Sequence, residues 1–184
     1  ISEQVANKIY DEMIDFAKYA FNKSHAAAYA VVSYQTAFLK YYYPVEFMAA
    51  LMTSVIEMPN KVAEYIQVCR QMGISILPPD VNCGMYGFSV DHGAIRYGLS
   101  AIKSVGRPVV DAILEERKKN GIFSSMEDFI NRMTNKEVNR RTIENFIKSG
   151  AMDSLPGTRR QKVAVAPVLL DNKARERKNA WEGR

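Results

Sequence analysis

Four consecutive polar residues stand where an aromatic-rich helix is predicted to begin. They offer an amide, an ammonium group, a hydroxyl and an imidazole, in the order Asn22, Lys23, Ser24 and His25. The first turn of a helix exposes backbone N–H groups and the positive end of the helix dipole, and both attract anions. We therefore predict a phosphate-binding site here. The alternative is a plain helix start, with Asn22 and Ser24 as caps and Lys23 and His25 in solvent.

A second candidate for phosphate binding is the turn IKSVG at residues 102–106. Its surroundings, LSAIKSVGRPVVDAI (99–113), have the spacing of a helix-hairpin-helix. Such a turn aims consecutive backbone N–H groups at a phosphate oxygen at the start of a helix, and it reads no base. The residues predicted to bind DNA in this way are Lys103, Ser104, Val105, Gly106 and Arg107.

The packing of this turn is also predicted from its pattern. Ile102 and Val105 would anchor the turn from below, and Val110 and Ile113 would form the packing face of the next helix. Ser104 departs from the pattern, which prefers glycine, and serine fits without strain only if this position has a negative φ. The alternative is a helical turn that only packs. A weaker hairpin candidate, KSGAMDSL, follows at 148–155.

Other chemistry is missing from the sequence, and no catalytic or metal-binding residue is predicted. No two carboxylates stand one residue apart on a strand, the arrangement that often holds paired Mg²⁺ ions for phosphoryl transfer. No phosphate-binding Walker loop, nucleophile elbow or Cys/His pair occurs. His92 is predicted to lie in a turn rather than to bind a metal. Cys69 and Cys83 are predicted to be buried free thiols, as expected in a reducing cytoplasm.

The elements that must position these residues are mostly helices. The spacing of apolar residues and the positions of Pro and Gly predict helices at 3–20, 24–42, 44–56, 59–72, 124–133, 135–150 and 157–184. Residues 101–121 are predicted to be a helix end, a tight turn and a further helix with Pro108 in its first turn and Gly121 past its end. Residues 74–80 form a short extended segment in this prediction. Residues 86–99 form a β-hairpin that turns at Asp91-His92-Gly93.

The composition is ordinary for a globular protein, and the charge is spread unevenly along the chain. A basic half can bind phosphates, and the alternative is that it forms only a solvated helical surface. The chain has 184 residues, of which 47% are hydrophobic and 24% charged, and no apolar run approaches the length of a bilayer span. Residues 1–98 hold 7 basic and 9 acidic residues, whereas residues 99–184 hold 18 and 11. The second half is therefore the better candidate for contact with backbone phosphates. The first residues lack both an initiator Met and a signal-peptide pattern, so we expect a piece of a longer cytoplasmic protein.

Four blocks of the sequence occur in an order that is typical of one family. They are FNKSHAAAYAVVSYQTAFLKYYYPVEFMAALMTS (21–54), LPPDVN (77–82), IRYGLSAIKSVG (95–106) and VNRRTIENFIKSGAMDSL (138–155). Through these blocks the chain closely resembles the alpha subunits of bacterial DNA polymerase III, the C-family replicative polymerases. The resemblance implies a mainly α fold with a helical fingers subdomain (1–80), a β-hairpin connector (81–98), a helix-hairpin-helix DNA-binding module (99–155) and a basic helical tail (156–184).

The resemblance also implies a function for each candidate site. The residues from Asn22 to His25 would lie beside the incoming nucleotide, and the turn from Lys103 to Arg107 would grip duplex DNA. The parent enzyme would transfer deoxynucleotides to a primer end with Mg²⁺ held by carboxylates upstream of this chain, so the isolated fragment is predicted to be inactive and to need no cofactor of its own. Expected partners are template–primer DNA and dNTP, with the sliding clamp and other replisome subunits bound by parts of the parent outside this chain. No membrane contact is expected.

Two other classes of function stay open from the residues alone. One is a free-standing DNA-binding protein that uses only the hairpin turn. The other is a helical scaffold that binds a protein, with its tail as the contact. The first predicts no nucleotide site, and the second predicts no salt-dependent affinity for DNA.

Overall fold

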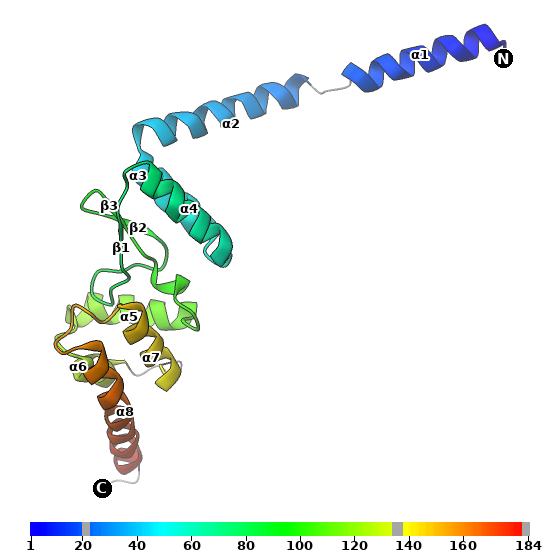
Figure 1. The fold of residues 1–184 in the computed structure, drawn as a ribbon. Helices are drawn as coiled ribbons and strands as arrows, with labels where there is room; N and C mark the ends of the chain where they lie inside the picture. The colour runs from blue at the N-terminus through cyan, green and yellow to red at the C-terminus, as the bar shows by residue number, and fades with distance from the viewer. Residues whose placement is uncertain (20–22, 134–137, 182–184) are drawn as a thin grey trace. The chain divides into compact units, whose positions relative to one another are not determined.

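The computed structural model describes residues 1–19, 23–133 and 138–181 (Figure 1). These residues contain eight α-helices, one short 3₁₀ helix and three short strands, so the predicted mainly α class is confirmed. Contacts along the chain divide it into two compact units, Ile1–Pro44 and Val45–Arg184, and each is described by itself. No helix in the described part is both long enough and apolar enough to cross a bilayer.

The first unit consists of two helices, α1 (Glu3–Tyr19) and α2 (Lys23–Tyr42). Both were predicted, but α2 begins at Lys23, so Ser24 lies inside the first turn and not at the capping position before it. Most apolar side chains of both helices are exposed among the described residues. Exposed apolar residues on these helices include Val5, Ile9, Met13, Phe16, Tyr29, Val31, Val32, Tyr34, Phe38, Leu39, Tyr41 and Tyr42. On α2 they point to several sides of the helix, which is the pattern of a helix that becomes buried on all faces.

The second unit begins with a helix pair and a small sheet. Proline occupies the first turn of both α3 (Pro44–Ser54) and α4 (Pro59–Gln71), where its missing N–H costs no hydrogen bond. Gly73 follows α4 with a φ of 74° and lets the chain leave the helix. The residues buried between these helices and the sheet are Met48, Ala49, Met52, Val62, Cys69, Ile74, Phe88 and Ile95.

The sheet contains the predicted hairpin and one strand more. Strands β2 (Ser89–Asp91) and β3 (Ala94–Arg96) pair antiparallel, and the turn between them has positive φ at His92 and Gly93. Strand β1 (Ile76–Leu77) pairs with β3 in parallel, which gives the order β1-β3-β2 (Figure 1). The sequence predicted the extended segment but not this pairing, because a parallel partner lies far away along the chain.

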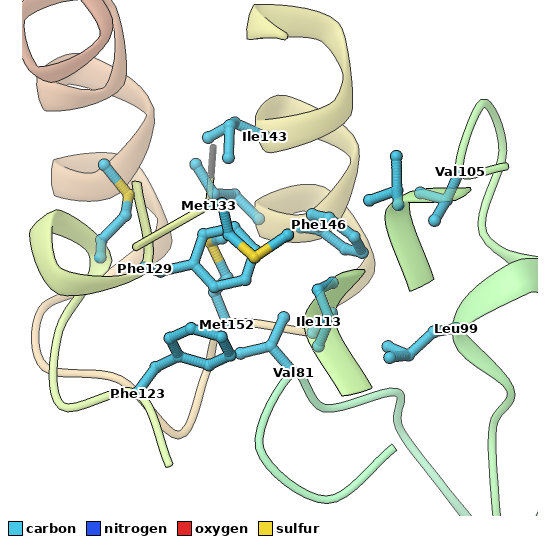
Figure 2. Close-up of a cluster of buried hydrophobic side chains, with 14 of the residues drawn as sticks. Val81, Leu99, Val105, Ile113, Phe123, Phe129, Met133, Ile143, Phe146 and Met152 are labelled. Carbon is cyan, nitrogen blue, oxygen red and sulfur yellow. The ribbon is translucent and has the colours of Figure 1, made fainter. Parts of the chain in front are cut away.

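The remaining helices enclose a second, larger core (Figure 2). They are the 3₁₀ helix η1 (Leu99–Ala101), α5 (Arg107–Asn120), α6 (Met126–Arg132), α7 (Arg140–Ser149) and α8 (Arg159–Trp181). Three phenylalanines pack edge to face in this core, Phe123 on Phe129 at 4.7 Å and Phe129 on Phe146 at 6.0 Å between ring centroids. Val81 reaches this core from the loop after β1, so the loop is fixed against the helices.

Local caps begin and end two of these helices. The Ser125 hydroxyl accepts a hydrogen bond from the N–H of Asp128 at 3.0 Å at the start of α6. Gly150 follows α7 in the left-handed conformation. Cys69 is buried as predicted, but Cys83 is exposed because it lies in a surface turn closed by Asp80, whose carboxylate accepts the Cys83 N–H at 3.1 Å. The prediction that both thiols are buried is therefore wrong for Cys83.

Two lysines of α8 attach this helix to the rest of the second unit. Lys162 is buried, and its ammonium donates to the carbonyls of Met152 at 2.6 Å and Leu155 at 2.7 Å. Burial lowers the pKa of Lys162. Lys173 donates to carbonyls at the C-terminal end of α6, including that of Met133 at 2.7 Å, where the helix dipole favours a cation. The basic tail is thus helical from Arg159 to Trp181, and it packs against the second unit as far as Lys173.

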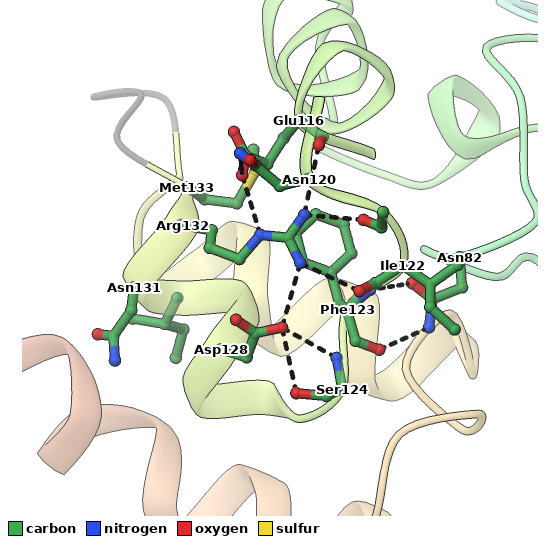
Figure 3. A network of polar contacts seen from close by, with 12 residues as sticks. Asn82, Glu116, Asn120, Ile122, Phe123, Ser124, Asp128, Asn131, Arg132 and Met133 are labelled. Carbon is green, nitrogen blue, oxygen red and sulfur yellow. Dashed lines mark hydrogen bonds and ion pairs between the residues drawn. The ribbon is translucent and has the colours of Figure 1, made fainter. Parts of the chain in front are cut away.

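Arg132 joins α5, α6 and the loop between them (Figure 3). Its guanidinium donates to the carboxylate of Glu116 at 2.9 Å, to Asp128 at 3.2 Å and to the carbonyl of Gly121 at 2.8 Å. It also lies over the ring of Phe123, 4.3 Å from the centroid. A planar group with five donors is suited to such a junction, because one side chain binds acceptors from three segments.

Candidate nucleic-acid interface

The turn at 102–106 is anchored in the protein core by the apolar side chains that the sequence predicted. Ile102 and Val105 are 6% and 5% exposed, and Val110 and Ile113 of α5 are fully buried. The N–H of Val105 donates to the carbonyl of Ile102 at 3.1 Å, which closes the turn. This arrangement fixes the backbone between η1 and α5 and leaves the residues in between on the surface.

The conformation of Ser104 differs from the prediction. Its φ is 64°, in the left-handed region that glycine adopts freely and other residues adopt at a cost. The expectation that serine fits without strain required a negative φ at this position, and that condition is not met. The turn therefore keeps the shape of the glycine-containing pattern, while Ser104 carries the strain.

Three backbone donors of the turn make no hydrogen bond within the described part of the chain. The N–H groups of Lys103, Ser104 and Gly106 have no hydrogen-bond acceptor among the described residues, and all three residues are exposed. A Cβ added to Gly106 would meet only Pro108 Cδ, at 3.6 Å, which is an ordinary contact. The protein itself thus leaves the space above Gly106 open, and the start of α5 adds the positive end of its dipole.

Two basic side chains flank these donors. Lys103 and Arg107 are exposed. The Arg107 guanidinium lies 5.1 Å from the centroid of the Tyr86 ring, and its Nε is 3.6 Å from the carboxylate of Asp111. At 73% exposure for Arg107 this ion pair is weak, so the guanidinium can turn to an incoming anion.

The structure adds two residues that sequence reasoning missed. Asn145 of α7 donates from its side-chain amide to the carbonyl of Lys103 at 2.6 Å, and Tyr86 supports Arg107. Neither residue is near the turn in the sequence. No local pattern identifies them, because only the folded chain brings α7 and the loop before β2 to the turn.

The first candidate site lies on the other unit. Lys23, Ser24 and His25 are exposed on the first turn of α2, and the His25 ring packs against Tyr29 with 4.4 Å between ring centroids. Asn22 lies outside the described residues. The three described side chains share an accessible helix start, which is the arrangement predicted to attract an anion.

The weaker candidate at 148–155 has a closed backbone. Ala151, Met152 and Leu155 are buried, and Lys162 occupies the carbonyls of Met152 and Leu155. The Arg159 guanidinium covers Gly150, since a Cβ there would come within 2.5 Å of Arg159 Nη2. This turn differs from 102–106 in that the Arg159 side chain of α8 fills the space beside its glycine.

No catalytic constellation accompanies these surfaces in the described part of the chain. No group of three His, Cys, Asp or Glu side chains there could hold a metal ion. His92 is exposed at the tip of the hairpin, where its Nδ1 lies 2.6 Å from Asp91 Oδ1. Hydrogen bonds from His92 and Arg96 lower the pKa of Asp91. We read this pair as part of the turn.

Comparison with known proteins gives the family context. Residues 73–162 match the family described as the helix-hairpin-helix motif. The chain is 47% identical over 169 residues to the DNA polymerase III subunit alpha of Thermus aquaticus and 51% identical over 156 residues to that of Vibrio cholerae. It is 41% identical over 183 residues to that of Chlamydia trachomatis.

The coverage of these matches is very unequal. They span 92%, 84% and 100% of this chain but only 14%, 14% and 15% of the three relatives. The chain therefore corresponds to about one seventh of the length of the curated relatives it matches. The resemblance deduced from the sequence blocks is confirmed for the chain as such a segment.

Proposed function

Because this chain is homologous to a segment of the bacterial DNA polymerase III alpha subunits, we propose that it works inside a DNA-directed DNA polymerase. In that enzyme, template-dependent deoxynucleotidyl transfer would be carried out by carboxylates outside this chain. The segment would bind duplex DNA without reading sequence and would help to position the incoming dNTP. The observation that carries this proposal is the set of unpaired, exposed N–H groups at Lys103, Ser104 and Gly106 beside open space.

The turn would hold a backbone phosphate in a simple way. A phosphate oxygen above Gly106 would accept hydrogen bonds from the backbone, while Lys103 and Arg107 would neutralise its charge. Hydrogen bonds to charged groups contribute about 1.5–3 kcal/mol each. None of these groups reaches a base edge from the backbone, so the affinity would not depend on sequence.

The first turn of α2 would act on the nucleotide side. Lys23 and His25 would neutralise triphosphate charge, and Ser24 with the helix N–H groups would orient the phosphate oxygens. Asn22 belongs to the same proposal. Negative charge develops on the departing pyrophosphate in the polymerase transition state, so positive groups held in place there would lower its free energy.

The uncovered apolar residues of α2 support a place within a larger assembly. Tyr34, Phe38 and Leu39 are 70%, 41% and 48% exposed in this chain. Aromatic residues on several faces of a helix are unfavourable in water, because their apolar surface stays exposed unless neighbouring segments cover it. We propose that other parts of the polymerase pack around α2 as part of the fingers, and we keep the domain boundaries at residues 80, 98 and 155 as proposals.

The Mg²⁺ ions of the parent reaction have no ligand set among the described residues of this chain. Metal ions in such enzymes polarise the phosphate and activate the attacking oxygen. We assign no step of that chemistry to this segment. Contacts with the sliding clamp and other replisome subunits would be made by parts of the parent outside this chain.

Fluorescence anisotropy with a random-sequence duplex at two salt concentrations tests the DNA-binding proposal. We expect affinity to fall as salt rises, because bound phosphates release counterions.

Gly106→Val should weaken binding about tenfold while circular dichroism stays unchanged, since the larger side chain occupies the space of the phosphate. Lys103→Gln should weaken binding more than Lys118→Gln, which removes an equally exposed charge at the far end of α5. Salt-independent binding would refute the proposal.

Lys23→Ala in the full-length polymerase tests the nucleotide proposal. We expect a raised KM for dNTP or a lowered kcat, with DNA affinity nearly unchanged. Lys40→Ala is the control, because Lys40 is an exposed lysine in the last turn of the same helix. If Lys23→Ala and Lys40→Ala show equal KM and kcat for dNTP, the nucleotide proposal is refuted. Only the DNA-binding proposal then remains for this chain.

A further inference from the structure

An open pocket lies directly beside the DNA-binding turn. It encloses about 560 Å³, within the range of pockets that hold small organic ligands. Its apolar wall comes from Pro78, Pro79 and Tyr97, and its polar rim comes from Lys103, Asn145 and Lys148. All of these residues belong to the second unit, and Lys103 is shared with the turn.

Contacts with neighbouring residues hold the apolar wall in place. The Tyr97 ring packs edge to face against the buried Phe88, with 4.9 Å between ring centroids, and burial raises the pKa of Tyr97. The two prolines stand directly after β1, and the carbonyl of Pro78 accepts a hydrogen bond from Arg96 at 2.9 Å. Rings that are fixed in this way lose little entropy when a flat apolar group packs on them.

The rim carries two ammonium groups from two different elements. Lys103 comes from the turn and Lys148 from the last turn of α7. Lys148 Nζ lies 3.2 Å from a carboxylate oxygen of Glu144, whose other oxygen accepts from Arg140 at 3.0 Å. Glu144 thus keeps a basic partner when Lys148 turns toward another anion. At 65% exposure, the cost of turning Lys148 is small.

We propose that this pocket binds one unpaired nucleotide of a DNA strand that continues from the duplex held by the turn. The base would pack on Pro78, the exposed proline of the two, and on Tyr97, and its phosphate would lie between Lys103 and Lys148. This inference rests on the proposed duplex binding, because Lys103 connects the two contacts. A phosphate paired with a flat apolar base matches both the two ammonium groups and the apolar wall, and stacking of this kind is how proteins hold single strands.

The experiment compares two DNA ligands on this 184-residue chain. One is a blunt random-sequence duplex, and the other is the same duplex with a short unpaired thymidine overhang. Base stacking contributes about 1–3 kcal/mol per base, so we expect the overhang ligand to bind roughly tenfold more tightly. A 2-aminopurine in the overhang should change its fluorescence on binding, as a base does when it leaves its neighbours for a protein surface.

Two variants separate the pocket from the turn. Lys148→Gln should reduce the preference for the overhang to about threefold or less and leave blunt-duplex affinity equal to that of Lys118→Gln. Ser149→Leu, which narrows the pocket from the last residue of α7, should abolish the preference. Lys148 is exposed, so its variant folds even if the Ser149 variant does not.

The outcomes distinguish the two proposals. If the chain binds blunt duplex in a salt-dependent way but shows no preference for the overhang, the proposed nucleotide pocket is refuted. The proposed duplex contact of the turn then still stands. An overhang preference that survives in Lys148→Gln and in a folded Ser149→Leu would also refute the pocket, since the unpaired base would then bind elsewhere. Loss of all DNA binding would refute the proposed function itself.

Discussion

The side-chain amide of Asn145 donates a hydrogen bond of 2.6 Å to the backbone carbonyl of Lys103. The bond joins α7 to the DNA-binding turn across 42 residues of sequence. It fixes one peptide of the turn from outside, directly before the strained Ser104. The orientation of the neighbouring N–H groups therefore depends on α7 as well as on the turn itself.

Asn145→Ala should loosen the turn without unfolding the second unit. Loss of this hydrogen bond should cost about 1 kcal/mol of folding free energy and weaken duplex binding a few-fold, because the donors are no longer held in place. Urea denaturation and anisotropy measure the two effects. Asn120→Ala is the control, since Asn120 makes a comparable bond of 2.7 Å to Glu116 at the far end of α5. Equal DNA binding by the two variants would contradict this function of Asn145.

Ser104→Gly should stabilise the protein. A left-handed φ of 64° costs a serine on the order of 1 kcal/mol relative to glycine, and this exceeds the extra entropy of glycine in the unfolded chain. We expect a higher urea midpoint and duplex affinity at least equal to that of the original chain. Ser104→Ala keeps the strain and should show no gain. A lower midpoint for Ser104→Gly would mean that the serine hydroxyl stabilises the turn.

Arg132→Lys should destabilise the second unit by about 2–3 kcal/mol. Lysine retains the charge but cannot bind Glu116, Asp128 and the Gly121 carbonyl together, and it does not cover the Phe123 ring as a planar group does. Thermal or urea unfolding measures the loss. Arg175→Lys, at an exposed position of α8, is the control and should change stability little. A similar loss of stability in both variants would show that the contacts of Arg132 do not contribute specifically.

Stability should fall as the pH drops below about 4. A hydrogen bond from the Ser124 N–H, with further contacts from Arg132, lowers the pKa of Asp128, and Arg159 lowers the pKa of Asp153. A carboxylate with a lowered folded pKa stabilises the fold above its unfolded pKa, and this contribution disappears as pH falls through the folded pKa.

Asp128→Asn tests this pH dependence directly. The variant should be less stable than the original chain at neutral pH, and the difference between the two should shrink between pH 5 and about pH 2. Urea midpoints at a series of pH values measure it. A difference that stays constant over this range would show that Asp128 titrates equally in the folded and unfolded chains.

The sequence by itself determined most of the local structure. Pro44, Pro59 and Pro108 each stand in the first turn of a helix, and Gly73 and Gly150 each follow a helix end with a positive φ. These residues restrict or permit φ whatever surrounds them, so their signal is readable from the chain alone. The apolar anchors of the 102–106 turn, Ile102 and Val105, were also readable, because the spacing of the pattern places them within four residues of each other.

Only the tertiary structure decided how the candidate interface is built. The parallel pairing of β1 with β3, the bond from Asn145 to Lys103 and the pocket between Pro79 and Lys148 each join residues far apart in sequence. The left-handed φ of Ser104 is also imposed from outside, because an isolated serine avoids it. Such features depend on packing between segments that are far apart in the sequence. The local preferences of single residues do not specify that packing.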